Sequence, residues 1–152
     1  MNGSNTTLSH APMCDRKFPT SCRLCQARLE AQDEAMRYHY ANAELALALG
    51  WTNIIELGGS LLGEPADGAP SCRGQAKVPD WCGDWCAAGD LLAQYPVSSV
   101  HWDEFALVGT AEPRGGHVAM VADHPDRATA IRYAIVRSVT EHLALIEELV
   151  SA

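Results

Sequence analysis

The six cysteines of this chain are the residues whose type and spacing could do chemistry. They fall into two groups of three, Cys14, Cys22 and Cys25, and Cys72, Cys82 and Cys86. A structural zinc ion takes four thiolate or imidazole ligands in a tetrahedron, and proteins usually supply them as two closely spaced pairs. Cys22-x-x-Cys25 and Cys82-x-x-x-Cys86 could supply such pairs, because each spacing brings both sulfurs onto one face of a helix.

A second interpretation treats the same cysteines as packing residues. Cys22 and Cys25 fall on the apolar stripe of a predicted helix, and Cys82 and Cys86 lie among the tryptophans of the stretch WCGDWC. In such surroundings cysteine behaves as a small buried hydrophobe. We therefore expect no cofactor, with a zinc ion as the alternative, and no disulfides in a chain that we expect to be cytoplasmic.

No complete catalytic motif is present. A zinc deaminase needs His-x-Glu followed by Pro-Cys-x-x-Cys, but in His101-Trp102-Asp103-Glu104 the glutamate comes one position late and the cysteine spacing differs. The sequence has no phosphate-binding glycine loop, nucleophile elbow or His-Glu-x-x-His pair. We therefore expect that the protein is not an enzyme.

Negative charge is concentrated in the middle of the chain. The net charge is -8, and residues 51–112 carry nine acidic and two basic side chains. Such a surface repels phosphate backbones, so we expect no direct binding to nucleic acid. It could serve solubility alone or attract a basic protein partner. The acidic residues predicted to bind a basic partner are Asp80, Asp90, Asp103 and Glu104.

Three basic residues near predicted loops support a different hypothesis. Together with His117 or His124, the side chains of Arg73, Lys77 and Arg114 could hold a phosphorylated small molecule, because guanidinium groups and exposed backbone N–H groups suit anions. More often such residues are only solvated.

Hydrophobic periodicity and turn residues define the elements that must position these side chains. The chain suits one domain of residues 20–152 after an irregular N-terminal arm of residues 1–19. The predicted elements are a helix from about residue 20 to 49, a strand at 51–57, a long Gly/Pro-rich loop at 58–80, a helix at 84–95, strands at 99–103, 105–110 and 117–122, and a final helix ending near 150. This order predicts an α+β fold in which helices pack against a small, mostly antiparallel sheet.

Apolar residues of the first and last helices keep helical spacing, and Leu47, Ile146 and Val150 belong to these predicted buried stripes. No apolar run approaches the roughly 18 residues of a membrane span, so we expect no membrane insertion. The N-terminus lacks the basic start and apolar stretch of a secretory signal, which favours the cytoplasm.

Three short motifs resemble those of the phage ABA-sandwich family, also called NinX-like. They are Leu49-Gly50-Trp51, then Asp84-Trp85 with Leu91 and Leu92 downstream, and then the stretch TAIRYAIV at residues 129–136. The resemblance covers roughly residues 38–145. It implies an α-β-α sandwich and a phage origin, and the family carries no established reaction.

Asp84 and Arg132 are the charged members of two of these motifs, and Arg132 lies among apolar helix neighbours. A buried charge must be partnered, since removing one partner costs about 3–5 kcal/mol. We predict that the two residues pair with each other, or that each binds backbone groups at a cap. A ligand-binding role is the alternative.

These observations predict a phage-encoded accessory protein in the cytoplasm of the host cell. Its expected action is to bind and inhibit a host antiviral defence complex, with a CRISPR–Cas complex as the expected target. The alternatives are a sponge for a nucleotide signal of host immunity and a zinc-stabilised phage regulatory or structural protein. Such proteins are often homodimers, but the sequence shows no exposed apolar stripe that requires one.

Overall fold

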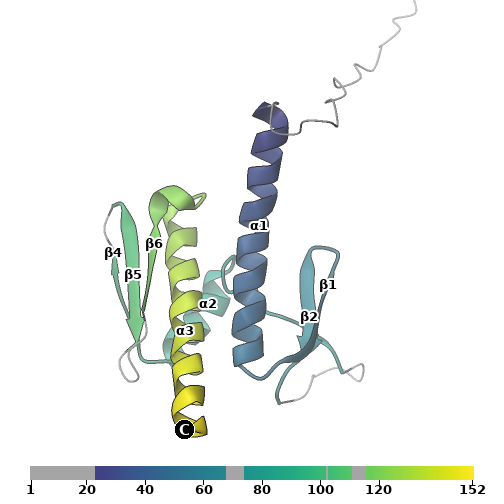
Figure 1. Ribbon diagram of the computed structural model, residues 1–152, viewed down its shortest axis with the longest axis vertical. Coiled ribbons are helices and arrows are strands. Elements are labelled where there is room, and N and C mark those ends of the chain that lie inside the picture. The colour runs from purple at the N-terminus through teal and green to yellow at the C-terminus, as the bar shows by residue number, and fades with distance from the viewer. Residues whose placement is uncertain (1–22, 68–73, 102, 111–115) are drawn as a thin grey trace, which may run out of the picture. The chain divides into compact units, whose positions relative to one another are not determined.

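The computed structural model describes residues 23–67, 74–101, 103–110 and 116–152 (Figure 1). The chain divides into two units, Met1–Glu34 and Ala35–Ala152, and the boundary falls inside the first helix, α1 (Arg23–Ala48). All the other helices and strands belong to the second unit, which is the subject of the following paragraphs. The predicted boundary between residues 19 and 20 lies outside the described residues.

One sheet consists of three consecutive antiparallel strands, β4 (Val97–His101), β5 (Phe105–Thr110) and β6 (Gly116–Met120). In the central strand β5 every second residue is buried, so that Ala106, Val108 and Thr110 form one face. The last helix, α3 (Arg127–Ser151), packs against this sheet. The three predicted strands and the final helix are thus confirmed.

The short helix α2 (Trp85–Gln94) also packs against α3, and its residues Ala88 and Leu91 are buried. The Asp84 carboxylate accepts a hydrogen bond from the backbone N–H of Cys86 (2.9 Å) and thereby caps the helix. The stretch WCGDWC is therefore the turn and first turn of a helix, as the capping pattern predicts.

A second small sheet occupies the region that we expected to be one long loop. Strands β1 (Thr52–Leu57), β2 (Ser60–Glu64) and β3 (Ala76–Lys77) pair in antiparallel order. Gly58 and Gly59 have φ angles of +59° and +76°, and Leu57 pairs with Ser60 across them. Two successive positive φ angles are the geometry of a tight type I′ hairpin turn, which glycine adopts without strain. The prediction of an irregular segment over residues 58–80 was therefore wrong.

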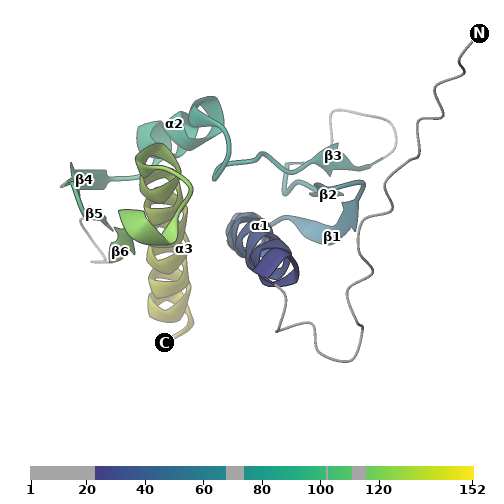
Figure 2. The same ribbon diagram turned by 90° about the horizontal axis from the view of Figure 1, so that it is seen from above.

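The layers within Ala35–Ala152 can be followed in Figure 2, where α3 lies between the β4–β6 sheet and α1, and β1–β3 lie beyond α1. The α+β class with antiparallel strands is confirmed. The expected single sheet flanked by helices is replaced by two three-stranded sheets with helices between them. The burial of α3 explains this layering, because consecutive residues such as Ala134, Ile135 and Val136 are all inaccessible. A helix buried at consecutive positions is covered on more than one face.

The core of this unit joins α1, the β4–β6 sheet and α3. Its largest fully buried apolar side chains include Leu45, Val108, Ile135, Val136 and Val139. The buried Ser138 hydroxyl donates a hydrogen bond to the Val108 carbonyl (2.7 Å), which links α3 to the middle of the sheet. Among the described helices, none combines the length and the apolarity needed to cross a membrane.

Candidate functional site

Arg132 fixes the turn before α2 to helix α3. Its side chain is 8% exposed; Nε donates to the Cys82 carbonyl (2.7 Å) and Nη2 to the Thr129 hydroxyl (3.1 Å). Its Cζ lies 5.1 Å from the centre of the Trp85 ring, within the range of a cation–π contact. Since Asp84 caps α2, the structure shows the second of the two predicted arrangements, in which each charged group binds the backbone.

Cys82 is a core residue whose surroundings do not favour a metal-binding thiolate. It is 1% exposed, and burial, with a smaller contribution from the Asp80 carboxylate, raises the pKa of its thiol to about 12. Cys86 is exposed. Cys25 lies in α1, and Cys22 lies outside the described residues. Within the described part of the chain, no group of three or more His, Cys, Asp or Glu side chains could hold a metal ion.

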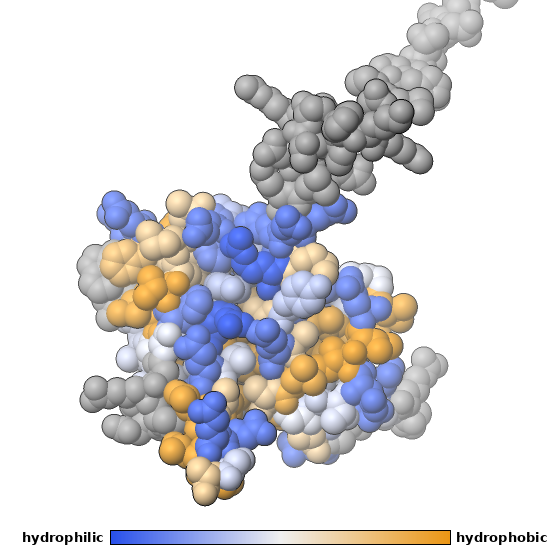
Figure 3. Space-filling model, in the orientation of Figure 1, coloured by the Kyte–Doolittle hydropathy of each residue, from blue (hydrophilic) through white to orange (hydrophobic). Residues whose placement is uncertain are grey.

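An apolar groove lies where the C-terminal ends of α1 and α3 come together, and we call it the helix-end groove. Its volume is about 510 Å³, and its lining residues include Leu47, Ala144, Ile146 and Val150. Leu47 is 59% exposed and Val150 is 82% exposed. Figure 3 shows hydrophobic and hydrophilic side chains next to one another over the C-terminal end of α3. The prediction that Leu47, Ile146 and Val150 are buried was wrong, because helical spacing continues beyond the point where the core ends.

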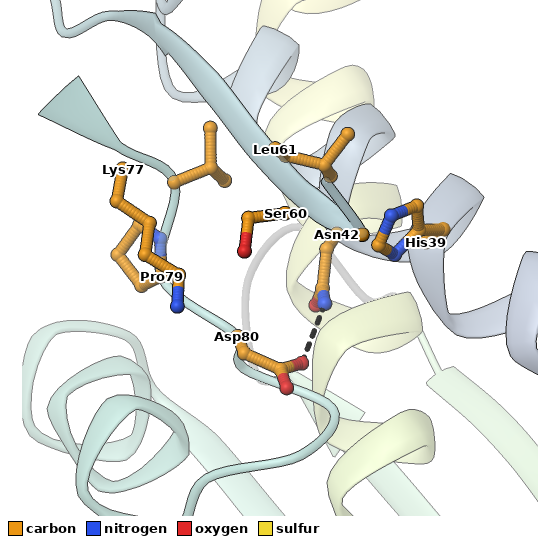
Figure 4. A pocket seen from close by; sticks show the side chains of 9 residues that line it. His39, Asn42, Ser60, Leu61, Lys77, Pro79 and Asp80 are labelled. Atoms are coloured by element: carbon orange, nitrogen blue, oxygen red, sulfur yellow. Dashed lines mark hydrogen bonds between the residues drawn. The ribbon is translucent and has the colours of Figure 1, made fainter. Parts of the chain in front are cut away.

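A smaller, polar hollow of about 70 Å³ lies between α1, strands β2 and β3 and the turn before α2 (Figure 4). The Asp80 carboxylate accepts hydrogen bonds there from Asn42 Nδ2 (2.8 Å) and the Gly83 N–H (3.0 Å). Asn42 is 4% exposed and also accepts a hydrogen bond from the Cys82 N–H (3.1 Å). These bonds attach the turn to α1, so the Asp80 carboxylate, although exposed, is hydrogen-bonded to groups of the same chain.

Lys77 lines the same hollow as Asp80. The hollow has room for a few water molecules, and it carries charges of both signs, which does not favour a phosphorylated ligand. Arg73 and Arg114, the other two residues of the predicted anion site, lie outside the described residues.

The remaining residues of the predicted acidic face come from separate elements. Asp90 is exposed on α2. Asp103 and Glu104 are exposed in the turn between β4 and β5, where Asp103 forms an ion pair with Arg127 (3.3 Å). Asp90 and Glu104 therefore keep carboxylates that are accessible to a partner.

The arginines of this unit whose side chains the structure describes are all engaged with groups of the same chain. Their contacts are Arg37 Nη1 to the Asp123 carbonyl (2.9 Å), Arg127 to Asp103 (3.3 Å), Arg132 to the Cys82 carbonyl (2.7 Å) and Arg137 to Glu44. In contrast, several exposed carboxylates of the described residues make no ion pair or hydrogen bond, namely those of Asp67, Asp90, Glu104, Asp123, Glu147 and Glu148. Arg37 and Lys77 are exposed and make no ion pair, so in the described part of this unit the exposed carboxylates without a partner outnumber the exposed cations without an ion pair.

Two tyrosines and two histidines form a cluster that the sequence did not predict. The Tyr38 hydroxyl and His124 Nδ1 are hydrogen-bonded (2.7 Å), and the Tyr133 ring lies 5.0 Å from His124 and 5.6 Å from His117 between ring centres. His117 Nδ1 also lies 3.7 Å from the Glu141 carboxylate. Burial nevertheless lowers the pKa of His117, so its imidazole is neutral at pH 7. The cluster joins α1, β6 and α3, and no local spacing in the sequence announces it.

The fold and these surfaces define an α+β protein with two small antiparallel sheets. No family model, no curated protein and no solved structure matches the chain. The resemblance to the phage ABA-sandwich family stays a prediction.

Proposed function

We propose that this chain is a non-catalytic binding protein that recognises a basic surface on a protein partner. The observation that supports this proposal is the difference in number between exposed carboxylates without a partner and exposed cations without an ion pair. In the described part of the second unit, six exposed carboxylates make no ion pair or hydrogen bond, whereas the exposed lysine and arginine side chains without an ion pair are those of Lys77 and Arg37. Free exposed charges of one sign attract a partner of the opposite sign over a distance of about 8 Å at physiological salt.

The proposed partner is a host antiviral defence complex, and a CRISPR–Cas complex is the first candidate. This part of the proposal comes from the phage resemblance of the sequence motifs around Trp51, Trp85 and Arg132. Such complexes contain basic channels that hold nucleic acid, and an acidic protein could occupy such a channel. The proposed location is accordingly the cytoplasm of the host cell.

An affinity capture of the tagged full-length protein tests this function. The bait is expressed in bacterial cells that carry several antiviral systems, and the bound proteins are identified by mass spectrometry. We expect one stoichiometric defence complex, whose retention weakens as the salt concentration rises. Capture of no such complex would contradict the defence proposal.

Two matched variants then test the charge argument with the captured partner. The neutralising pair Asp90→Asn with Glu104→Gln removes two exposed charges, and the pair Asp90→Glu with Glu104→Asp keeps them. Exposed ion pairs contribute about 0.2–1 kcal/mol each, so we expect the neutralising pair to weaken binding by roughly twofold to thirtyfold. The charge-preserving pair should bind like the original protein. Equal affinity for both pairs at every salt concentration would refute the electrostatic argument.

A further inference from the structure

We propose that the helix-end groove binds the apolar face of a basic amphipathic helix. The proposal rests on the proposed function for the basic character of the partner, and it adds the place and the form of recognition. A groove between two helices is a common docking site for an amphipathic helix, whose apolar side chains enter it at helical spacing.

The shape of the groove suits aliphatic side chains. Leu47 projects from α1, and Ile146 and Val150 project from α3, while the small residues Ala48 and Ala144 line the space between them. Leu47 and Val150 are more than half exposed, so a partner could cover them without any opening of the core. Covering exposed apolar surface is the main favourable term in most protein association.

The charges around the groove select a basic occupant. Glu147 lines the groove, its neighbour Glu148 is exposed, and neither carboxylate is paired within the described residues. The groove also lies at the C-terminal ends of α1 and α3, and the last turns of both helices lack a basic residue. A helix C-terminus carries a partial negative charge of about half a unit, which lysine or arginine compensates. Glu147, Glu148 and the two helix ends therefore all favour cationic side chains beside the apolar face of the occupant.

The same charges disfavour a second copy of this chain in the groove. Two copies joined through their grooves would bring Glu147 and Glu148 of one copy close to those of the other. Like charges held together at an interface weaken the association. An external basic helix meets no such repulsion.

A titration with synthetic peptides tests the inference on the full-length protein. The probe is an 18-residue helical peptide of leucine and lysine with one apolar face. One comparison peptide replaces lysine with glutamate, and another replaces leucine with serine. We expect binding of the leucine–lysine peptide, and at least tenfold weaker binding of each comparison peptide, by isothermal titration calorimetry.

Variants of the exposed groove residues locate the binding. Leu47→Ser and Val150→Ser should each weaken binding of the leucine–lysine peptide by about tenfold, because each removes exposed apolar surface that the peptide covers. The matched control is Leu57→Ser, which changes a leucine that is 65% exposed in β1 outside the groove. Unchanged affinity in both groove variants would overturn the inference. Equal binding of the leucine–glutamate peptide would overturn the choice of a basic occupant.

Two further results separate this inference from the proposed function. If the captured partner still binds the groove variants but is lost from the Asp90→Asn, Glu104→Gln variant, the function stands and the groove inference fails. If the peptide binds in the groove and no basic protein is captured, the inference stands and the proposed function fails. A concentration-dependent dimer that Leu47→Ser abolishes would identify a second copy as the occupant and overturn the inference.

Discussion

Replacing Arg132 with methionine should lower the free energy of unfolding by about 2–3 kcal/mol. The methionine keeps much of the apolar stem but removes the Nε donor that binds the Cys82 carbonyl at 2.7 Å. A buried carbonyl left without a partner costs about 1–3 kcal/mol. Loss of the cation–π contact with the half-exposed Trp85 adds about 0.5–1 kcal/mol. Relief of the guanidinium desolvation offsets a part of this loss.

The measurement is urea unfolding followed by tryptophan fluorescence, with the same dependence on urea required for both proteins. The matched control is Arg127→Met on the same helix, where the arginine is 46% exposed and pairs with the fully exposed Asp103. That variant should change the free energy by at most about 1 kcal/mol. If Arg132→Met were no less stable than Arg127→Met, the assigned role of the Cys82 carbonyl would be refuted.

A double-mutant cycle with Trp85→Leu separates the two contributions of Arg132. Arg132 and Trp85 are in direct contact, so their effects should not add, and the coupling should be about 0.5–1 kcal/mol. Additive effects would mean that the cation–π contact contributes nothing to stability. The carbonyl contact would then account for the whole effect of Arg132→Met.

Three further predictions follow from single residues. Gly59→Ala should lower the free energy of unfolding, measured with urea, by about 1–2 kcal/mol. The φ angle of Gly59 is +76° and the added Cβ would meet no atom within 4 Å, so the cost comes from the backbone conformation alone. Gly59→Asn should cost less, and an unchanged stability of the alanine variant would contradict the turn assignment. Iodoacetamide labelling with peptide mapping should modify the exposed Cys86 quickly and the buried Cys82 only on unfolding, whereas equal labelling would refute the burial of Cys82. Burial lowers the pKa of the His117 imidazole from 6.5 in the folded state, so as the pH falls the unfolded state binds a proton at this residue first, and stability should fall below pH 6.5 towards the lower folded pKa. His117→Phe should reduce the dependence of the urea midpoint on pH between pH 8 and 5.5. An unchanged pH dependence would contradict this prediction.

The elements that the sequence predicted correctly are those whose signals are local. Strand β5 alternates buried and partly buried residues at every position, and α2 begins directly after a capping aspartate. The hairpin of β1 and β2 was missed although Gly58-Gly59 is itself a hairpin signal. The density of glycine and proline in residues 58–80 favoured a loop, but backbone pairing between strands outweighed that composition.

Helical periodicity identified the apolar face of α3 but not the extent of its cover. Ile146 and Val150 continue the spacing of Ile135 and Val139, yet the former pair is exposed and the latter pair is buried. The difference depends on where the neighbouring elements end, and the sequence of α3 does not indicate that position. The helix-end groove could not be predicted from the sequence for this reason, because an apolar residue beyond the end of the core has the same helical spacing as one within the core.

The net charge of the sequence likewise predicts that the surface is acidic, but it does not predict which carboxylates are free to meet a partner. Asp80 and Asp90 are both aspartates of the acidic middle region, but Asp80 accepts hydrogen bonds from Asn42 and Gly83, whereas Asp90 is free on α2. The net charge counts every arginine as if it neutralised one carboxylate. Among the described arginines of the second unit, Arg127 and Arg137 pair with carboxylates, whereas Arg37 and Arg132 bind carbonyls, which leave the charge of the guanidinium in place. In the described part of this unit, exposed carboxylates without a partner thus outnumber exposed cations without an ion pair, and we expect those carboxylates, together with the exposed aliphatic side chains at the helix ends, to determine what the protein binds.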